Sequence, residues 1–290
     1  MQRVPPCTGN QFRQDPEQQE FDLGTGIGHH SCASAGNCPI PQQFLLAKRE
    51  IPSTSLTLPK LFISPLPPTF MPFPTRKAIL WDNDGVLVDS ERLFYQANRD
   101  FFREYGIELT PRQFFDWYLL DDCGAWHLLG VSGPQVERLR AQRNLIYNRL
   151  LREADDLLVP GMDELLTGLT PHLRLGIVTS SRREDFLTIH TRLPLLRHFE
   201  FVLTGEDYTH SKPSPEPYLL GLEQLGLEAK DCLVIEDSPR GLEAARAAGI
   251  DCIVVRTALT EGYEFPGASA IVNSTAELAD AIQALVRVAP

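Results

Sequence analysis

The chain lacks an excess of positive charge, and it lacks a long apolar run. Its 290 residues include 27 lysines and arginines against 38 aspartates and glutamates, which gives a net charge of −11. Such a surface repels nucleic acid and anionic lipid, so we expect neither as a partner. No apolar run approaches the roughly 18 residues that span a membrane, and no basic start precedes an apolar core as in a signal peptide. An anionic substrate would need a local positive charge instead.

The cysteines show no disulfide framework. Six are present, and Cys232 and Cys252 lie in apolar runs, where cysteine behaves as a small hydrophobic residue. We therefore expect a reducing compartment, the cytoplasm. We also expect a monomer. Four possible zinc ligands near the N-terminus fit none of the usual finger spacings, which disfavours a zinc site: His29, His30, Cys32 and Cys38.

Residues 1–75 differ in composition from the rest of the chain. They hold twelve of the 23 prolines and show no sustained helical or strand period. This composition is typical of a disordered extension. An alternative to a disordered extension is that the protein starts at Met71. In that case, a chain that begins at Met71 should fold and act like the full one. Loss of activity in that shortened chain would refute the alternative.

From residue 76 onward, short apolar runs alternate with amphipathic segments. We expect strands at 78–81, 173–179, 199–204, 232–237, 251–255 and 270–272. Continuous apolar strands that alternate with helices predict an α/β fold with a parallel sheet covered on both faces. No strand pattern interrupts residues 91–156, where helices are expected after Asp89 or Ser90 and near 111–117 and 134–151. The sequence therefore predicts a core of residues 76–89 and 158–290, with a helical insertion at 90–157.

Polar residues follow three of these strands, where ligands gather in parallel sheets. The stretches are Asp82-Asn83-Asp84-Gly85, Thr179-Ser180-Ser181 and Glu236-Asp237-Ser238, and Lys212 precedes the third. Each has an ordinary explanation. Asp, Asn and Gly favour turns, Ser181 can cap the next helix, acidic residues suit a helix start, and a lone lysine is most often on the surface.

Together, however, these residues indicate an anion-binding site with a metal. Clustered carboxylates raise one another's pKa, and they are tolerated when a hard divalent cation lies among them. Carboxylate oxygens and waters suit Mg²⁺, which commonly also binds a substrate phosphate. Lys212 would add a second positive charge and Thr179 a neutral donor. Phosphoryl transfer needs such a site, because negative charge spreads over the transferring oxygens.

The motifs resemble those of the haloacid-dehalogenase-like hydrolases over about residues 78–258. The Asp-x-Asp-Gly-Val-Leu start is followed, in order, by a Thr/Ser strand end, Lys-Pro and Glu-Asp-Ser-x-x-Gly. The resemblance implies a Rossmann-like parallel sheet core, with the insertion at 90–157 as an all-helical cap over the site.

The resemblance also implies residue roles. Asp82 would be the nucleophile that forms an aspartyl-phosphate, and Asp84 the general acid and base. Thr179 and the backbone of Ser180 would bind phosphate, and Lys212 would steady both the nucleophile and the phosphoryl group. The implied Mg²⁺ ligands are Asp82, the backbone carbonyl of Asp84, Asp237, and Glu236 directly or through water.

The motif set leaves alternatives open. Asp84 favours phosphate over halide chemistry, because the founding dehalogenases lack the second aspartate. A beta-phosphoglucomutase would carry a histidine where Phe94 stands and an arginine where Gly133 stands. We therefore favour a phosphatase acting on a small phosphorylated metabolite over a phosphosugar mutase. A non-catalytic binding protein on the same fold is a third possibility, although the motif set is intact. Five insertion residues are candidate substrate contacts, each more commonly a packing or surface residue: Glu91, Arg92, Tyr95, Trp126 and His127.

Overall fold

The computed structural model describes residues 76–286. The segment 1–75, with the four candidate zinc ligands and Met71, lies outside the described residues.

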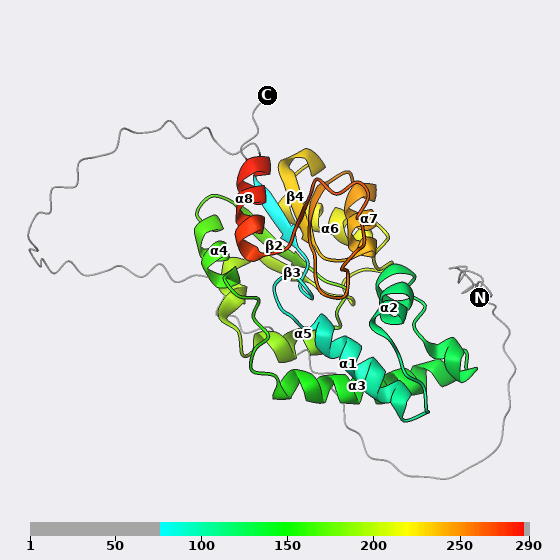
Figure 1. Ribbon diagram of the computed structural model, residues 1–290. Coiled ribbons are helices and arrows are strands. Elements are labelled where there is room, and N and C mark those ends of the chain that lie inside the picture. The colour runs from blue at the N-terminus through cyan, green and yellow to red at the C-terminus, as the bar shows by residue number, and fades with distance from the viewer. Residues whose placement is uncertain (1–75, 287–290) are drawn as a thin grey trace, which may run out of the picture. The chain divides into compact units, whose positions relative to one another are not determined.

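A six-stranded sheet forms the centre of this part of the chain (Figure 1). Its strands are β1 (Ala78–Trp81), β2 (Arg174–Val178), β3 (Phe201–Leu203), β4 (Cys232–Glu236), β5 (Asp251–Val255) and β6 (Ala270–Val272). They lie in the order β3-β2-β1-β4-β5-β6, and every neighbouring pair is parallel. The predicted α/β fold with a parallel sheet is confirmed.

The strand register places the predicted site residues side by side. Trp81, the last residue of β1, pairs with Ile177 of β2 and with Ile235 of β4. Because all three strands run in the same direction, the residues that follow them emerge at the same edge of the sheet. The polar stretches that begin at 82, 179 and 236 are therefore neighbours.

Helices cover both faces of the sheet, because side chains alternate along each strand. Ile79 and Trp81 belong to a core that includes residues of α4 (Met162–Leu169), α5 (Arg183–His190) and α8 (Thr275–Val286). Ala78 and Leu80 belong to a second core with residues of α6 (Glu216–Leu225) and α7 (Pro239–Ala247). All four residues of β1 are fully buried, which explains their continuous apolar run. Two 3₁₀ turns, η4 (Pro194–His198) and η5 (Ala229–Asp231), connect these elements.

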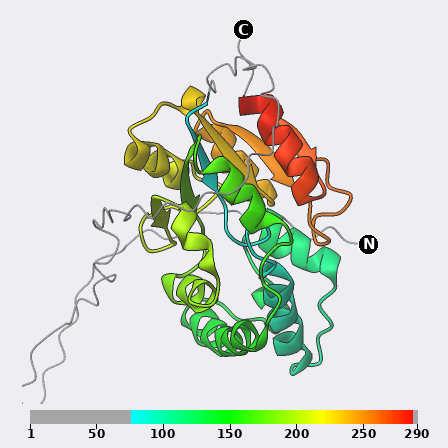
Figure 2. The same ribbon diagram turned by 90° about the vertical axis from the view of Figure 1, so that its left-hand side faces the viewer.

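The insertion between β1 and α4 contains helices and no named strand among the described residues. Its elements are α1 (Glu91–Arg103), α2 (Pro111–Phe114), the π-helix η2 (Phe115–Leu120), the 3₁₀ turn η3 (Trp126–Leu129) and α3 (Pro134–Glu153). The helix expected at 111–117 is therefore a short α-helix that continues as a π-helix. Figures 1 and 2 show α1 and α3 beyond one end of the sheet.

The insertion has a hydrophobic core of its own, which is rich in aromatic residues. It includes Phe101, Phe102, Phe114 and Trp126, and its buried residues belong to neither core of the sheet, although α1 and α3 also contribute residues to one of those cores. The proposed boundaries of core and cap stay a prediction. Within residues 76–286, no helix is both long enough and apolar enough to cross a bilayer.

Candidate active site

The loop after β1 presents Asp82 and Asp84 through a tight turn. The carbonyl of Asn83 accepts hydrogen bonds from the N–H groups of Leu87 and Val88, which closes the turn. Gly85 adopts a left-handed conformation with φ +78°, and a Cβ there would lie 1.9 Å from Oδ2 of Asp237. Only glycine meets both conditions, because a side chain would add strain and a clash.

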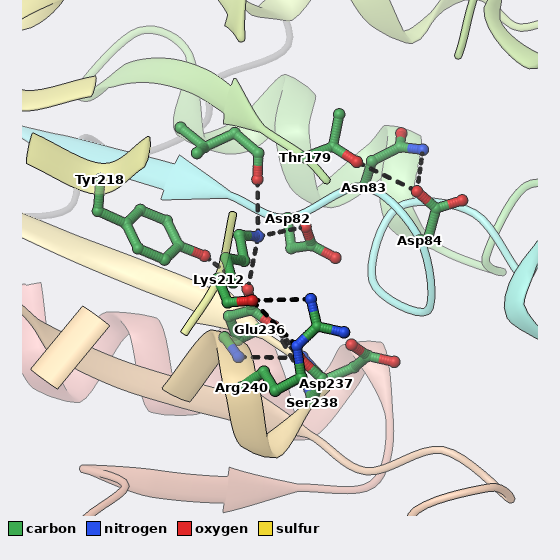
Figure 3. Close-up of polar contacts among 12 residues, drawn as sticks. Asp82, Asn83, Asp84, Thr179, Lys212, Tyr218, Glu236, Asp237, Ser238 and Arg240 are labelled. Atoms are coloured by element: carbon green, nitrogen blue, oxygen red, sulfur yellow. Dashed lines mark hydrogen bonds and ion pairs between the residues drawn. The ribbon is translucent and has the colours of Figure 1, made fainter. Parts of the chain in front are cut away.

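Lys212 connects the ends of three strands through its Nζ, as the dashed lines in Figure 3 show. Its Nζ donates to Asp82 Oδ1 at 2.6 Å, to Glu236 Oε1 at 2.7 Å and to the carbonyl of Val178 at 2.9 Å. Only 4% of the residue is exposed, so the interpretation as a surface lysine is wrong. Burial acts to lower the pKa of Lys212, but the charges of Asp82 and Glu236 outweigh it and raise this pKa above its ordinary value. Lys212 is therefore a permanent cation beside Asp82.

Glu236 is fully buried, and both of its oxygens accept hydrogen bonds. Oε1 accepts from Lys212 and from the hydroxyl of Tyr218, the latter at 2.6 Å. Oε2 accepts from the N–H of Asp237 at 3.1 Å and from the hydroxyl of Ser238 at 3.1 Å. Burial acts to raise the pKa of Glu236, but the charge and hydrogen bond of Lys212 lower it below the ordinary value. Glu236 is thus a charged side chain whose oxygens are already engaged.

Asp237 differs from Glu236, although both are buried. Its Oδ2 is buried and finds no hydrogen-bond partner in residues 76–286. Burial, with the charges of Glu91 and Asp82, raises the pKa of Asp237 well above its ordinary value. Burial and nearby carboxylates likewise raise the pKa of Asp82, against the effect of Lys212. A cation next to Asp237 would offset both the burial and the nearby negative charges that raise its pKa.

These carboxylates fit a divalent cation. Asp82, Glu236 and Asp237 each offer an oxygen, and the three oxygens lie within 4.8 Å of one another. An all-oxygen donor set suits Mg²⁺, and the unpartnered Oδ2 of Asp237 is a ready ligand. The side chain of Asp84 is not part of this group, and its predicted contribution through the backbone carbonyl stays a prediction.

The carboxylate of Asp84 faces hydroxyl groups. Its Oδ2 accepts from Ser181 Oγ at 2.6 Å and from Thr179 Oγ1 at 3.2 Å, and its Oδ1 accepts from the hydroxyl of Ser90 (Figure 3 shows the Thr179 contact). Ser90 stands at the N-cap position of α1, but its side chain forms no capping bond. The helix that Ser181 was expected to cap has Arg182 at its N-cap position instead. Both serines hold Asp84 rather than a helix end.

A cavity of about 410 Å³ joins these residues to the insertion. Six of the seven predicted site residues line it: Asp82, Asp84, Thr179, Ser180, Lys212 and Asp237. Glu236 lies beneath it, fully buried. The volume is within the range of pockets that hold small metabolites.

The predicted contacts from the insertion divide into two groups. Glu91 and Trp126 line the cavity, and burial, with the charge of Asp84, raises the pKa of Glu91 to about 7. The other three are not among the lining residues. Arg92 forms ion pairs with two aspartates, Tyr95 donates to the carbonyl of Leu109, and His127 packs edge-on against an aromatic ring.

Sequence reasoning missed Tyr218 and Arg143. Tyr218 is fully buried and its hydroxyl donates to Glu236. The centre of its ring lies 4.9 Å from Nζ of Lys212. Arg143 is a buried cation on the cavity wall. Neither stands in a strand-end motif. Each falls within a helical pattern where tyrosine and arginine are unremarkable.

Comparisons with known proteins place the chain in a family. A family profile described as haloacid dehalogenase-like hydrolase matches residues 79–255. A phosphorylated carbohydrates phosphatase of Thermotoga maritima is 30% identical over 188 residues, which cover 61% of this chain and 83% of that protein.

Two solved structures share the fold. One is a CbbY variant from Rhodobacter sphaeroides in complex with xylulose-(1,5)bisphosphate, at 25% identity and a TM-score of 0.60, with 70% of this chain and 96% of that chain covered. The other is a beta-phosphoglucomutase from Clostridium difficile, at 23% identity and a TM-score of 0.62, with 73% and 97% covered. At 23% identity, the similarity to the second structure shows a shared fold alone.

Proposed function

Because the chain belongs to the haloacid dehalogenase-like hydrolases, we propose that it is a Mg²⁺-dependent phosphatase that hydrolyses a small phosphorylated metabolite, such as a sugar phosphate. One observation carries the proposal. The buried carboxylate of Asp82 lies 2.6 Å from the ammonium of Lys212, at a cavity that Asp84 and Thr179 also line. The similar phosphatase of Thermotoga maritima supports the substrate class. We also propose that the protein is a monomer and, from its cysteine usage, that it is cytoplasmic.

Asp82 acts as the nucleophile in this proposal. Its Oδ1 is held by Lys212, which leaves the other oxygen to attack phosphorus. The bond from phosphorus to the leaving oxygen breaks as the bond to Asp82 forms, and Asp84 gives the leaving oxygen a proton. Water then attacks the phosphorus of the aspartyl-phosphate as Asp84 takes a proton from that water, the bond from phosphorus to Asp82 breaks, and inorganic phosphate leaves. Lys212 and Thr179 offset the charge on the transferring oxygens.

The residues that would hold Mg²⁺ are Asp82, Asp237 and the backbone carbonyl of Asp84. When bound, the ion stabilises negative charge on the phosphoryl oxygens and on the clustered carboxylates. Glu236 already accepts hydrogen bonds at both oxygens. We therefore propose that it acts by positioning Lys212, and that any contact with the ion is through water.

Hydrolysis of p-nitrophenyl phosphate tests the proposal. The wild type should release phosphate with Mg²⁺ and stop with EDTA, and Asp82→Asn should be inactive. Asp89→Asn is a matched control, because it removes an exposed carboxylate from the same loop region and should retain activity. A wild type that is inert toward a broad panel of phosphorylated metabolites would support the non-catalytic binding protein. Conversion of a sugar bisphosphate without release of inorganic phosphate would support the mutase.

A further inference from the structure

The cavity wall contributed by the insertion carries a positive charge that the proposed reaction leaves without a role. Arg143 lies on α3, is 5% exposed, and lines the cavity that contains Asp82. Its Nη1 donates to the side-chain oxygen of Asn98 at 2.9 Å, and its Nε donates to that of Asn144 at 3.0 Å. Both acceptors are neutral amides, so the guanidinium is oriented but its charge is not neutralised.

The other cations of this cavity all have acidic partners. Within residues 76–286, four of the five lysines and arginines on its wall form ion pairs within 4.0 Å: Lys212 with Asp82 and Glu236, Arg182 with Asp185, Arg240 with Asp122, and Arg140 with Glu137. Arg143 forms none with any described carboxylate at that distance. In a chain with 38 acidic residues, a buried arginine without one requires an explanation.

Aromatic packing explains where Arg143 lies but not why its charge is retained. Its guanidinium carbon is 4.3 Å from the ring centre of Phe94 and 6.0 Å from that of Trp126. These rings hold the guanidinium in place and offset part of the cost of its burial. Burial lowers the pKa of Arg143 to about 10, so the group remains a cation at neutral pH. A neutral side chain could fill the same space at less cost.

We propose that Arg143 binds a second oxyanion of the substrate, so that the preferred substrates are phosphate esters with a further phosphate or carboxylate group. This inference rests on the proposed phosphatase function. The planar guanidinium presents paired N–H groups that match the oxygens of either anion. The fixed amide contacts and the aromatic rings orient it before the substrate binds, which lowers the entropic cost of recognition. Arg143 would thus determine specificity, and bond cleavage would remain with the residues at the strand ends.

The test uses non-hydrolysable ligands, because the natural substrate is unidentified. Alkyl phosphonates are compared with phosphonocarboxylates and bisphosphonates of matched and increasing chain length, in the presence of Mg²⁺. Binding is measured by calorimetry, with inhibition of p-nitrophenyl phosphate hydrolysis as a second readout. At the best chain length, the second anion should tighten binding of the wild type by roughly tenfold or more. The carboxylate and phosphonate arms show which anion is preferred.

Variants of α3 identify the residue responsible. Arg143→Gln should reduce affinity for the best doubly anionic ligand by the same factor, roughly tenfold or more, which removes its advantage over the alkyl phosphonate. Arg143→Lys should keep part of the advantage, because it retains the charge without the planar fork. Arg149→Gln is the matched control, since it removes an exposed arginine from the same helix and should keep the advantage in full.

Two results would overturn the inference. One is a wild type for which no chain length gives the second anion an advantage. The other is an advantage that survives in a folded Arg143→Gln variant, with folding checked by circular dichroism. Both results leave phosphatase activity toward p-nitrophenyl phosphate intact. Failure of the proposed function would instead appear as a wild type without Mg²⁺-dependent hydrolysis, and calorimetry would still decide whether Arg143 binds the second anion.

Discussion

Tyr218→Phe should destabilise the protein more than an ordinary loss of a tyrosine hydroxyl. The hydroxyl of Tyr218 is buried and donates to Glu236 Oε1 at 2.6 Å. Burial and the charge of Glu236 raise the pKa of Tyr218 well above its ordinary value, so the hydroxyl is a permanent donor. A hydrogen bond to a charged acceptor contributes about 1.5–3 kcal/mol, against about 0.5–1.5 kcal/mol for a neutral one. The substitution removes one oxygen and keeps the ring against Lys212, so we expect a loss of about 2 kcal/mol.

Tyr208→Phe provides the matched comparison. The hydroxyl of Tyr208 donates to the backbone carbonyl of Thr179 at 2.8 Å, which is a neutral acceptor. The same chemical change there should cost about 1 kcal/mol. Urea unfolding of the wild type and both variants, at one pH and without added metal, gives the two differences. If Tyr218→Phe costs no more than Tyr208→Phe, the assignment of Glu236 as a charged, fully engaged carboxylate is wrong.

Three further predictions concern the same region. Gly241→Ala should abolish activity and destabilise the fold, because the new Cβ would lie 1.8 Å from the carboxylate carbon of Glu236. The hydrogen-bond donors around Glu236 keep that carboxylate from moving away. Phosphatase assays measure the first effect and thermal unfolding the second. Lys212→Met should lower the free energy of unfolding by about 3–5 kcal/mol, since it leaves buried carboxylates without their cation, and a loss below about 1 kcal/mol in urea unfolding would contradict this. Burial lowers the pKa of His190 from 6.5 to about 4. Between these two pH values the unfolded chain binds a proton at His190 and the folded chain does not, so the contribution of His190 to stability is lost as the pH falls from about 6.5 to about 4. This loss should reach about 3 kcal/mol, and it should be absent from His190→Gln when the two unfolding curves are compared across that range.

The sequence predicted the sheet well because its strands are buried on both faces. All six strands lie within the expected ranges, as the run at 78–81, which is fully buried, illustrates. The strand-end motifs also led to the residues that line the cavity, because parallel strands bring their carboxyl ends to one edge. The strands and the residues at their ends could be predicted because both depend on local patterns that a single sequence contains.

Contacts across elements could not be predicted in the same way. Ser90 looked like a helix cap, but its hydroxyl is used by Asp84 in the turn before α1. The burial of Lys212 depends on carboxylates 130 and 24 positions away, so only the combination of motifs, and not the lone lysine, predicted its place in the site. The burial of Arg143 depends on how α3 packs on α1, which hydrophobic periodicity does not specify.

The separate aromatic core of the insertion has a consequence for how this enzyme can change. Phe101, Phe102 and the other buried members of this cluster belong to neither core of the sheet, although α1 and α3 also contribute Leu93, Ala97, Tyr147 and Leu151 to one of those cores. Mutations at distant sites without shared partners have nearly additive effects. Selection or laboratory evolution can therefore change the interior of the aromatic cluster in small, nearly independent steps, whereas changes at Leu93, Ala97, Tyr147 or Leu151 also affect a core of the sheet.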